Sequence, residues 1–100
     1  MFIHHVFFWL KKGLRKSDKD RFKEGLNSLS TLSIVKSAHI GVPARTKRDV
    51  IDRSYSYSLL LQFENETHQA IYQANPTHRK FVEDCSSLWE KVIVYDSVDV

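Results

Sequence analysis

Residues 2–10 read FIHHVFFWL, and this stretch decides the fold class. Aromatic and β-branched side chains dominate it, a composition typical of a β-strand. Because side chains alternate across a strand, Phe8 lies on one face while Phe7 and Trp9 lie on the other. Both faces are largely apolar, although His4 and His5 interrupt them. A strand of this kind needs a cover on each side, so it indicates a layered domain with a buried sheet.

The rest of the chain predicts one α+β domain spanning residues 1–100, with the ferredoxin-like order β-α-β-β-α-β. Four strands in this order form an antiparallel sheet with both helices on one side. The predicted elements are strands over 2–10, 34–42, 55–63 and 91–98, a helix capped by Ser17 with Asp20 completing the cap, and a helix from Asn65 that is broken at Asn75-Pro76.

Both helices carry an apolar stripe. Phe22, Leu26 and Leu29 repeat at helical spacing in the first helix, where a close approach to the sheet is one reason for a glycine at position 25. The stripe of the second helix after its proline is predicted to hold His78, Phe81, Val82, Cys85 and Trp89. Two helices cover only one face of the sheet, whereas the first and last strands are apolar on both. We therefore expect a homodimer in which a second copy covers the other face.

Composition and charge restrict the function classes. Hydrophobic residues make up 42% of the chain, and Cys85 is the only cysteine, which excludes an internal disulfide. The apolar start is too short to span a bilayer, and its positive charges follow rather than precede it, unlike a signal peptide. We expect a cytoplasmic protein with no membrane partner.

The basic residues gather in two loops, residues 11–16 and Arg45 to Arg53, within a formal net charge of +3. Solvated turns explain such clusters, and a rim that attracts an anionic ligand is the alternative. No aromatic residues alternate with the charges, so we do not expect a nucleic-acid partner. No glycine-rich phosphate loop or nucleophile-elbow motif is present, so any chemistry is expected to run without a cofactor.

Three stretches resemble the stress-responsive dimeric α+β barrel (Dabb) family: HHVFFWLKKG, LLLQFENETHQAIYQANPTHRKFV and SLWEKVIVYDS. The resemblance spans essentially the whole chain and is most specific from Tyr72 to Phe81. It implies a dimeric α+β barrel in which the sheets of two protomers pack face to face. The chain is also similar to the plant branch of polyketide (olivetolic acid) cyclases, which fold a linear polyketide into an aromatic acid without a cofactor.

The cyclase resemblance implies three catalytic residues. His78 matches the base, and Tyr72 and His5 match the groups that assist it. We expect aromatic side chains to bind a small hydrophobic or aromatic ligand beside them: Phe7, Trp9, Phe22, Phe81 and Trp89. The family usually reads His-Pro-Ala-His where this chain has Asn75-Pro76-Thr77-His78, and the first helix matches the plant enzymes poorly. The substrate is therefore open.

Alternatives remain at each position. His78 is either a general base, kept neutral by burial and by the positive end of its helix, or a buried structural histidine. Tyr72 and Cys85 have ordinary core interpretations. His5 and His78 lack a third strong ligand, so no metal site is expected. The function is a cofactor-free cyclase-like or lyase-like enzyme, a non-catalytic stress protein whose role is stable assembly, or a cofactor-free monooxygenase. A cavity of roughly 300 Å³ or more that reaches His78 favours the enzyme.

Overall fold

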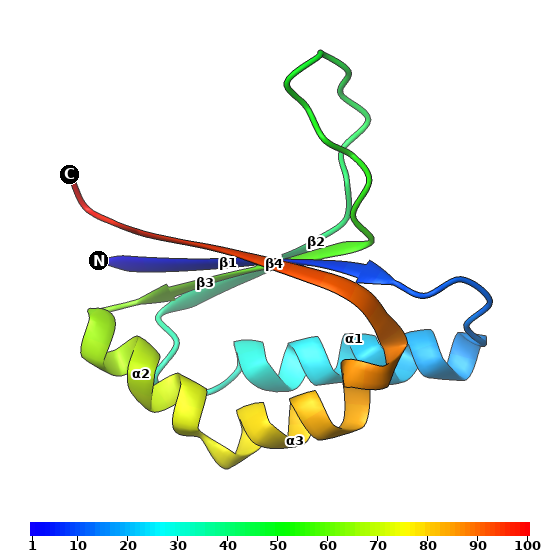
Figure 1. Ribbon diagram of the computed structural model, residues 1–100. Coiled ribbons are helices and arrows are strands. Elements are labelled where there is room, and N and C mark those ends of the chain that lie inside the picture. The colour runs from blue at the N-terminus through cyan, green and yellow to red at the C-terminus, as the bar shows by residue number, and fades with distance from the viewer.

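The computed structural model describes residues 1–100 as two layers, a four-stranded antiparallel sheet and a layer of helices on one of its faces (Figure 1). The strand order is β2-β3-β1-β4, so the first strand is central and pairs with the last. The elements are β1 (Phe2–Leu10), α1 (Lys16–Ser30), β2 (Ser37–Gly41), β3 (Tyr57–Phe63), α2 (Glu66–Ala74), α3 (Pro76–Cys85), a 3-10 turn (Ser86–Leu88) and β4 (Trp89–Val98). The predicted ferredoxin-like α+β fold is confirmed.

Some predicted boundaries are wrong for local reasons. Helix α1 begins before Ser17, because Asp18 accepts a hydrogen bond of 3.2 Å from the backbone N–H of Arg15 and closes the first turn there. Strands β2 and β3 are shorter than expected, because β2 begins only at Ser37 and residues 42–56 leave the sheet as a long loop. Trp89 is not on the α3 stripe; the 3-10 turn ends the helix, and Trp89 opens β4.

The core lies between the sheet and the helices. Phe22, Leu26 and Leu29 of α1 are fully buried, as are the inward side chains of β3 and Tyr72 of α2. Aromatic rings fill the centre of this layer, where Phe22 lies 5.1 Å from Phe8 and 5.8 Å from Phe81 between ring centroids. No helix has the length and apolar composition that crossing a membrane requires.

Gly25 marks a close approach between helices rather than between helix and sheet. A Cβ atom at this position would lie 2.6 Å from Cδ1 of Phe81 and 3.3 Å from Sγ of Cys85, both on α3. The expected approach to the sheet is therefore wrong. The glycine lets α1 and α3 pack side by side, as Figure 1 shows.

The change Gly25→Ala is expected to lower the free energy of unfolding by about 1 kcal/mol, although alanine favours helices. Overpacking against Phe81 costs roughly 1–3 kcal/mol, which exceeds the gain in helix propensity of about 1 kcal/mol. Urea unfolding measures the difference. In a Phe81→Leu background, which removes the ring, the same change should become neutral or stabilising. A stabilising effect in the unmodified protein would contradict the account.

The second face of the sheet carries no helix. Ile3, His5, Phe7 and Trp9 of β1 point to it, and the pairing register places Leu60 of β3 and Ile93 and Tyr95 of β4 beside them. Aromatic rings cluster there, with Phe7 5.0 Å from Tyr55 and 6.0 Å from Tyr95 between centroids. We call this surface the open face. Tyr95 is 64% exposed on this face. A cluster of large, partly exposed aromatic side chains is typical of a surface that binds a partner.

Candidate functional site

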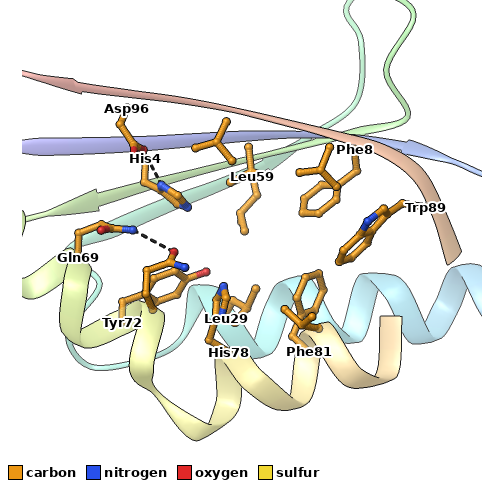
Figure 2. Close-up of a pocket in the computed structure, with 15 residues that line it drawn as sticks. His4, Phe8, Leu29, Leu59, Gln69, Tyr72, His78, Phe81, Trp89 and Asp96 are labelled. Carbon is orange, nitrogen blue, oxygen red and sulfur yellow. Dashed lines mark hydrogen bonds and ion pairs between the residues drawn. The ribbon is translucent and has the colours of Figure 1, made fainter. Parts of the chain in front are cut away.

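A pocket of about 410 Å³ lies between the sheet and the helices α2 and α3 (Figure 2). Its two ends differ in chemistry, with polar side chains at the end near α2 and aromatic side chains at the other. The lining residues are His4, Val6, Phe8, Leu29, Leu59, Gln69, Tyr72, Gln73, His78, Phe81, Val82, Trp89, Val92, Val94 and Asp96. A cavity that is mostly apolar with a few convergent polar groups is the usual form of a small-molecule site.

His4 and Asp96 form the central polar contact of the pocket. The two residues pair across β1 and β4, and Nδ1 of His4 lies 2.6 Å from Oδ1 of Asp96. A carboxylate only accepts hydrogen bonds, so this contact places the imidazole proton on Nδ1. In the neutral imidazole, Nε2 of His4 then carries the lone pair. The histidine is 6% exposed, so its contact with Asp96 is made by a largely buried ring.

Tyr72 lies between two histidines. Its ring centroid is 5.9 Å from that of His4 and 5.0 Å from that of His78, in edge-on arrangements. Burial raises the pKa of the Tyr72 hydroxyl far above its usual value, because the charged phenolate loses its solvation. The hydroxyl therefore stays protonated at neutral pH and is a hydrogen-bond donor at this end of the pocket.

His78 stands in the first turn of α3, where the Asn75 cap and Pro76 begin the helix. The Asn75 side chain accepts a hydrogen bond of 2.8 Å from the backbone N–H of Thr77, which fixes this turn. Desolvation lowers the pKa of His78, and the nearby His4 lowers it further. The imidazole is therefore neutral near pH 7, as a proton acceptor requires.

The lowered pKa of His78 predicts a loss of stability in mild acid. The unfolded chain, with an ordinary histidine pKa near 6.5, takes up the proton before the folded state does. Stability is therefore present above about pH 6.5 and falls as the pH drops through that value towards the folded pKa. Urea unfolding of the wild type and of His78→Gln at pH 7.5 and 5.5 measures the contribution. The wild type should lose more, by at most about 1.4 kcal/mol per pH unit. Equal losses would contradict the assignment.

The structure brings together only some of the predicted site residues. Tyr72, His78, Phe81 and Trp89 line the pocket, whereas His5 points to the open face. The expected position of His5 in this pocket is therefore wrong, because strand alternation puts its neighbour His4 on the helix side. Burial, with smaller contributions from His39 and His4, lowers the pKa of His5 on that other face.

Three predicted ligand-binding aromatics also lie elsewhere. Phe7 and Trp9 follow His5 onto the open face, where they line a shallow hollow of about 200 Å³. Phe22 does not line the pocket. It is fully buried in the core, where its ring packs against Phe8, Phe81 and Trp89.

His4 and Asp96 are the pocket-lining residues that sequence reasoning missed. The signal for His4 was its place on the same strand face as Phe2 and Val6. Asp96 carried no signal of its own, because it enters the site through the pairing of the first strand with the last.

No cluster of three or more His, Cys, Asp or Glu side chains has the geometry of a metal site. Cys85 is buried in the core, and desolvation raises the pKa of its thiol, so the reactive thiolate is disfavoured. The chemistry that the pocket offers is acid–base chemistry, with two imidazoles and one phenol arranged around a cavity.

The strand order and the single helical layer define a ferredoxin-like α+β domain. Residues 2–99 match the family described as Stress responsive A/B Barrel Domain, or Dabb. The chain therefore belongs to the Dabb family, as the resemblance of its sequence indicated. No curated protein matches the sequence.

Several solved structures share the fold. A Dabb family protein with a ferredoxin-like fold from Mesorhizobium loti is 24% identical, with a TM-score of 0.79, and the match covers 99% of this chain and 96% of that one. A hydroxynitrile lyase from Passiflora edulis is 18% identical, with a TM-score of 0.79 and coverage of 99% and 93%. A dimeric ferredoxin-like protein of unknown function from Thermobifida fusca is 13% identical, with a TM-score of 0.78 and coverage of 98% and 90%.

Proposed function

We propose that this protein is a cytoplasmic, cofactor-free acid–base catalyst, cyclase-like or lyase-like, that acts on a small hydrophobic or aromatic carbonyl compound. The observation that carries the proposal is the 2.6 Å contact between His4 and Asp96 beside Tyr72 and His78, at the polar end of an apolar cavity. A base with a carboxylate partner, a protonated phenol and a neutral second imidazole are the groups that proton transfer next to a carbonyl requires.

The geometry supports a definite division of roles. Nε2 of His4 accepts a proton from the substrate, and the resulting imidazolium is stabilised by the Asp96 carboxylate on Nδ1. The Tyr72 hydroxyl donates a hydrogen bond to the oxygen on which negative charge develops. His78, held neutral by burial, is placed to accept or return a second proton. A cyclase-like reaction takes the first proton from a carbon, and a lyase-like reaction takes it from a hydroxyl group.

The apolar end of the pocket indicates the kind of ligand. Phe8, Phe81 and Trp89 form a cluster there, with centroids 5.3 Å and 5.8 Å from the Trp89 ring. These rings offer edge and face contacts to an aromatic or alkyl group, while the polar end receives the reacting oxygen. The hydroxynitrile lyase of Passiflora edulis has the same fold, which adds support for chemistry of this kind on the domain.

Proton exchange tests this proposal without knowledge of the natural substrate. A panel of small aryl and alkyl ketones in D₂O, followed by NMR, should show saturable exchange of the proton next to the carbonyl, and cyanohydrins should be cleaved if the lyase variant is correct. His78→Gln should lower the rate, whereas His68→Gln, on α2 outside the pocket lining, should not. Exchange at the same rate in His78→Gln as in the wild type would contradict the proposal.

We further propose that the protein is a homodimer that buries its open face, which is the basis of the alternative function in stable assembly. The apolar side chains of that face are only partly covered within the chain, and the Thermobifida fusca protein of the same fold is described as dimeric. A stable interface buries roughly 1,200–2,000 Å² in total, and we expect two sheets packed face to face to reach it.

The change Phe7→Glu is expected to convert the dimer to a monomer. It places a charge at the centre of the open face, where burial without a partner costs several kcal/mol. Light scattering at micromolar concentration measures the state. Glu90→Gln, on exposed β4, is the control and should stay dimeric. A wild-type protein that is monomeric at this concentration would overturn the dimer.

A further inference from the structure

The loop from Val42 to Ser56 joins β2 to β3 and rises from the sheet on the side opposite the helices (Figure 1). Its base is held firmly. The Ser56 N–H donates to the Phe8 carbonyl at 2.7 Å, and the Ser56 hydroxyl accepts from the Leu10 N–H at 2.9 Å. Nε1 of Trp9 donates to the Ser54 hydroxyl at 3.0 Å. The loop is thus fixed to β1 and projects past the open face as an arm.

The outer part of this arm carries an exposed apolar side chain and basic side chains that have no ion-pair partner within the chain. Val50 is 84% exposed, between Asp49 and Ile51. The arm carries four basic side chains and two acidic ones, so its net charge is 4 − 2 = +2. None of the four basic side chains has an ion-pair partner within the chain. These residues are Arg45, Lys47, Arg48 and Arg53.

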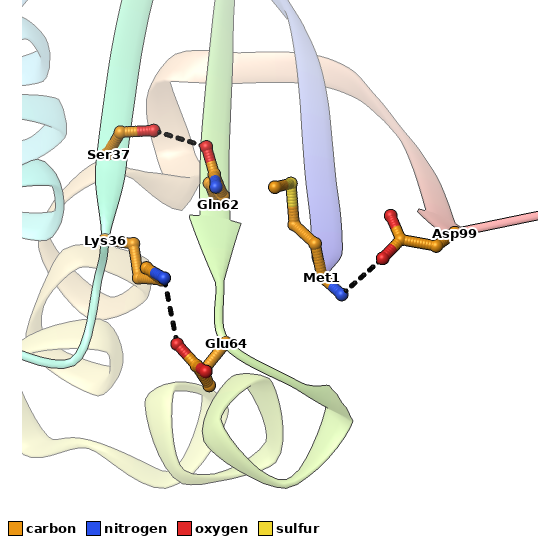
Figure 3. A network of polar contacts seen from close by, with 6 residues as sticks. All are labelled: Met1, Lys36, Ser37, Gln62, Glu64 and Asp99. Carbon is orange, nitrogen blue, oxygen red and sulfur yellow. Dashed lines mark hydrogen bonds and ion pairs between the residues drawn. The ribbon is translucent and has the colours of Figure 1, made fainter.

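Two carboxylates lie at the opposite end of the strands, each in an ion pair within the chain (Figure 3). Asp99 lies 2.9 Å from the Met1 ammonium, and Glu64 lies 2.9 Å from Nζ of Lys36. Both carboxylates remain accessible, with side chains 75% and 58% exposed. A carboxylate has about four acceptor sites, so each can receive a second cation. The last part of β4 also rises on the side of the open face at this end, as Figure 1 shows.

The two projections limit how two open faces can meet. If the two-fold axis lies between the two sheets and runs across the strands, the strands of the two copies point in opposite directions. The arm of each copy then lies against the end of the other copy that carries Glu64 and Asp99. A two-fold axis along the strands instead brings arm towards arm, with like charges facing. Opposite charge favours the first arrangement, and like charge disfavours the second.

We propose that the arm, residues 42–56, clasps a second copy of this chain and docks its basic tip on the Glu64 and Asp99 end of that copy. The proposal rests on the homodimer proposed above and adds the orientation of the two copies and the part of each that fixes it. The exposed Val50 then packs at the rim of the interface. The basic side chains of the arm form ion pairs with Glu64 and Asp99 of the other copy. Contacts of this kind set register and association rate more than total affinity.

Charge reversal tests the arm. A variant with Arg45→Glu, Lys47→Glu and Arg48→Glu should raise the Kd of the dimer by about tenfold or more and remove its dependence on salt. A control with Lys12→Glu, Lys19→Glu and Lys23→Glu changes the net charge equally on the helix side and should leave Kd unchanged. Sedimentation equilibrium at 50 and 300 mM salt measures both.

A second variant keeps the test decisive. Protein with Glu64→Lys and Asp99→Lys should dimerise poorly alone but form a tight heterodimer when mixed with the reversed arm. If Phe7→Glu gives a monomer while the reversed arm leaves Kd unchanged, the docking of the arm is contradicted and the homodimer proposal is retained. Tight binding of a single-stranded 20-nucleotide RNA that is lost with the reversed arm, with the dimer unaffected, would also overturn it. A monomeric wild type removes both proposals.

Discussion

Replacement of His4 by alanine is expected to lower the rate of proton transfer in the pocket by about 10²–10⁴-fold, the usual effect of removing a general base. The substitution removes Nε2 as an acceptor and leaves Asp96 without the imidazole it orients, at 2.6 Å in the structure. The measurement is the rate of hydrogen exchange or turnover with whichever compound of the test panel gives a saturable signal.

The neighbouring histidine is the matched control. His5→Ala removes the same side chain one residue along the same strand, but from the open face, so the exchange rate per folded molecule should stay close to that of the wild type. Asp96→Asn should lower the rate in the same direction as His4→Ala, because the amide no longer fixes the tautomer. Loss of activity in His5→Ala with retention in His4→Ala would reverse the assignment of the base.

Replacement of Phe22 by alanine is expected to lower the free energy of unfolding by about 3–5 kcal/mol, a large part of the total for a small domain. The side chain is fully buried and touches rings from the sheet and from α3, so the structure cannot close the cavity that its removal leaves. Urea unfolding checks the value. Ile71→Ala is the control, since this side chain of α2 is 51% exposed and should cost much less. A loss below about 1 kcal/mol for Phe22→Ala would mean that the core repacks.

The fold was predictable from the sequence because the local sequence patterns and the tertiary packing favour the same arrangement. The stripe of Phe22, Leu26 and Leu29, the Asn75-Pro76 break and the apolar strands each allow one arrangement, and the family resemblance points to the same one. The position of the α1 cap was not predictable by the same route. Ser17 is a good capping residue, but Asp18 reaches the Arg15 backbone and starts the helix earlier.

The site was predictable only in part, and the reason is the double-sided first strand. Alternation separates His4 from His5, but it does not say which face the helices cover when both faces are apolar. That choice depends on the docking of α1 and α2, which is a tertiary property. Asp96 was hidden for a related reason, because nothing near it in the sequence marks it, and only the β1–β4 register places it beside His4.

The contact between His4 and Asp96 joins residues 92 positions apart, across the pairing of the first strand with the last. A loop of that length closes late, because the entropy lost in bringing its ends together is repaid only when the whole sheet edge forms. Helices α1, α2 and α3 need only local contacts and form faster. During refolding from urea, helical signal should therefore return before the pocket exists, and activity should recover with the slowest phase. The pair that we propose to be catalytic therefore forms late in folding, so a partly folded chain is expected to have no activity.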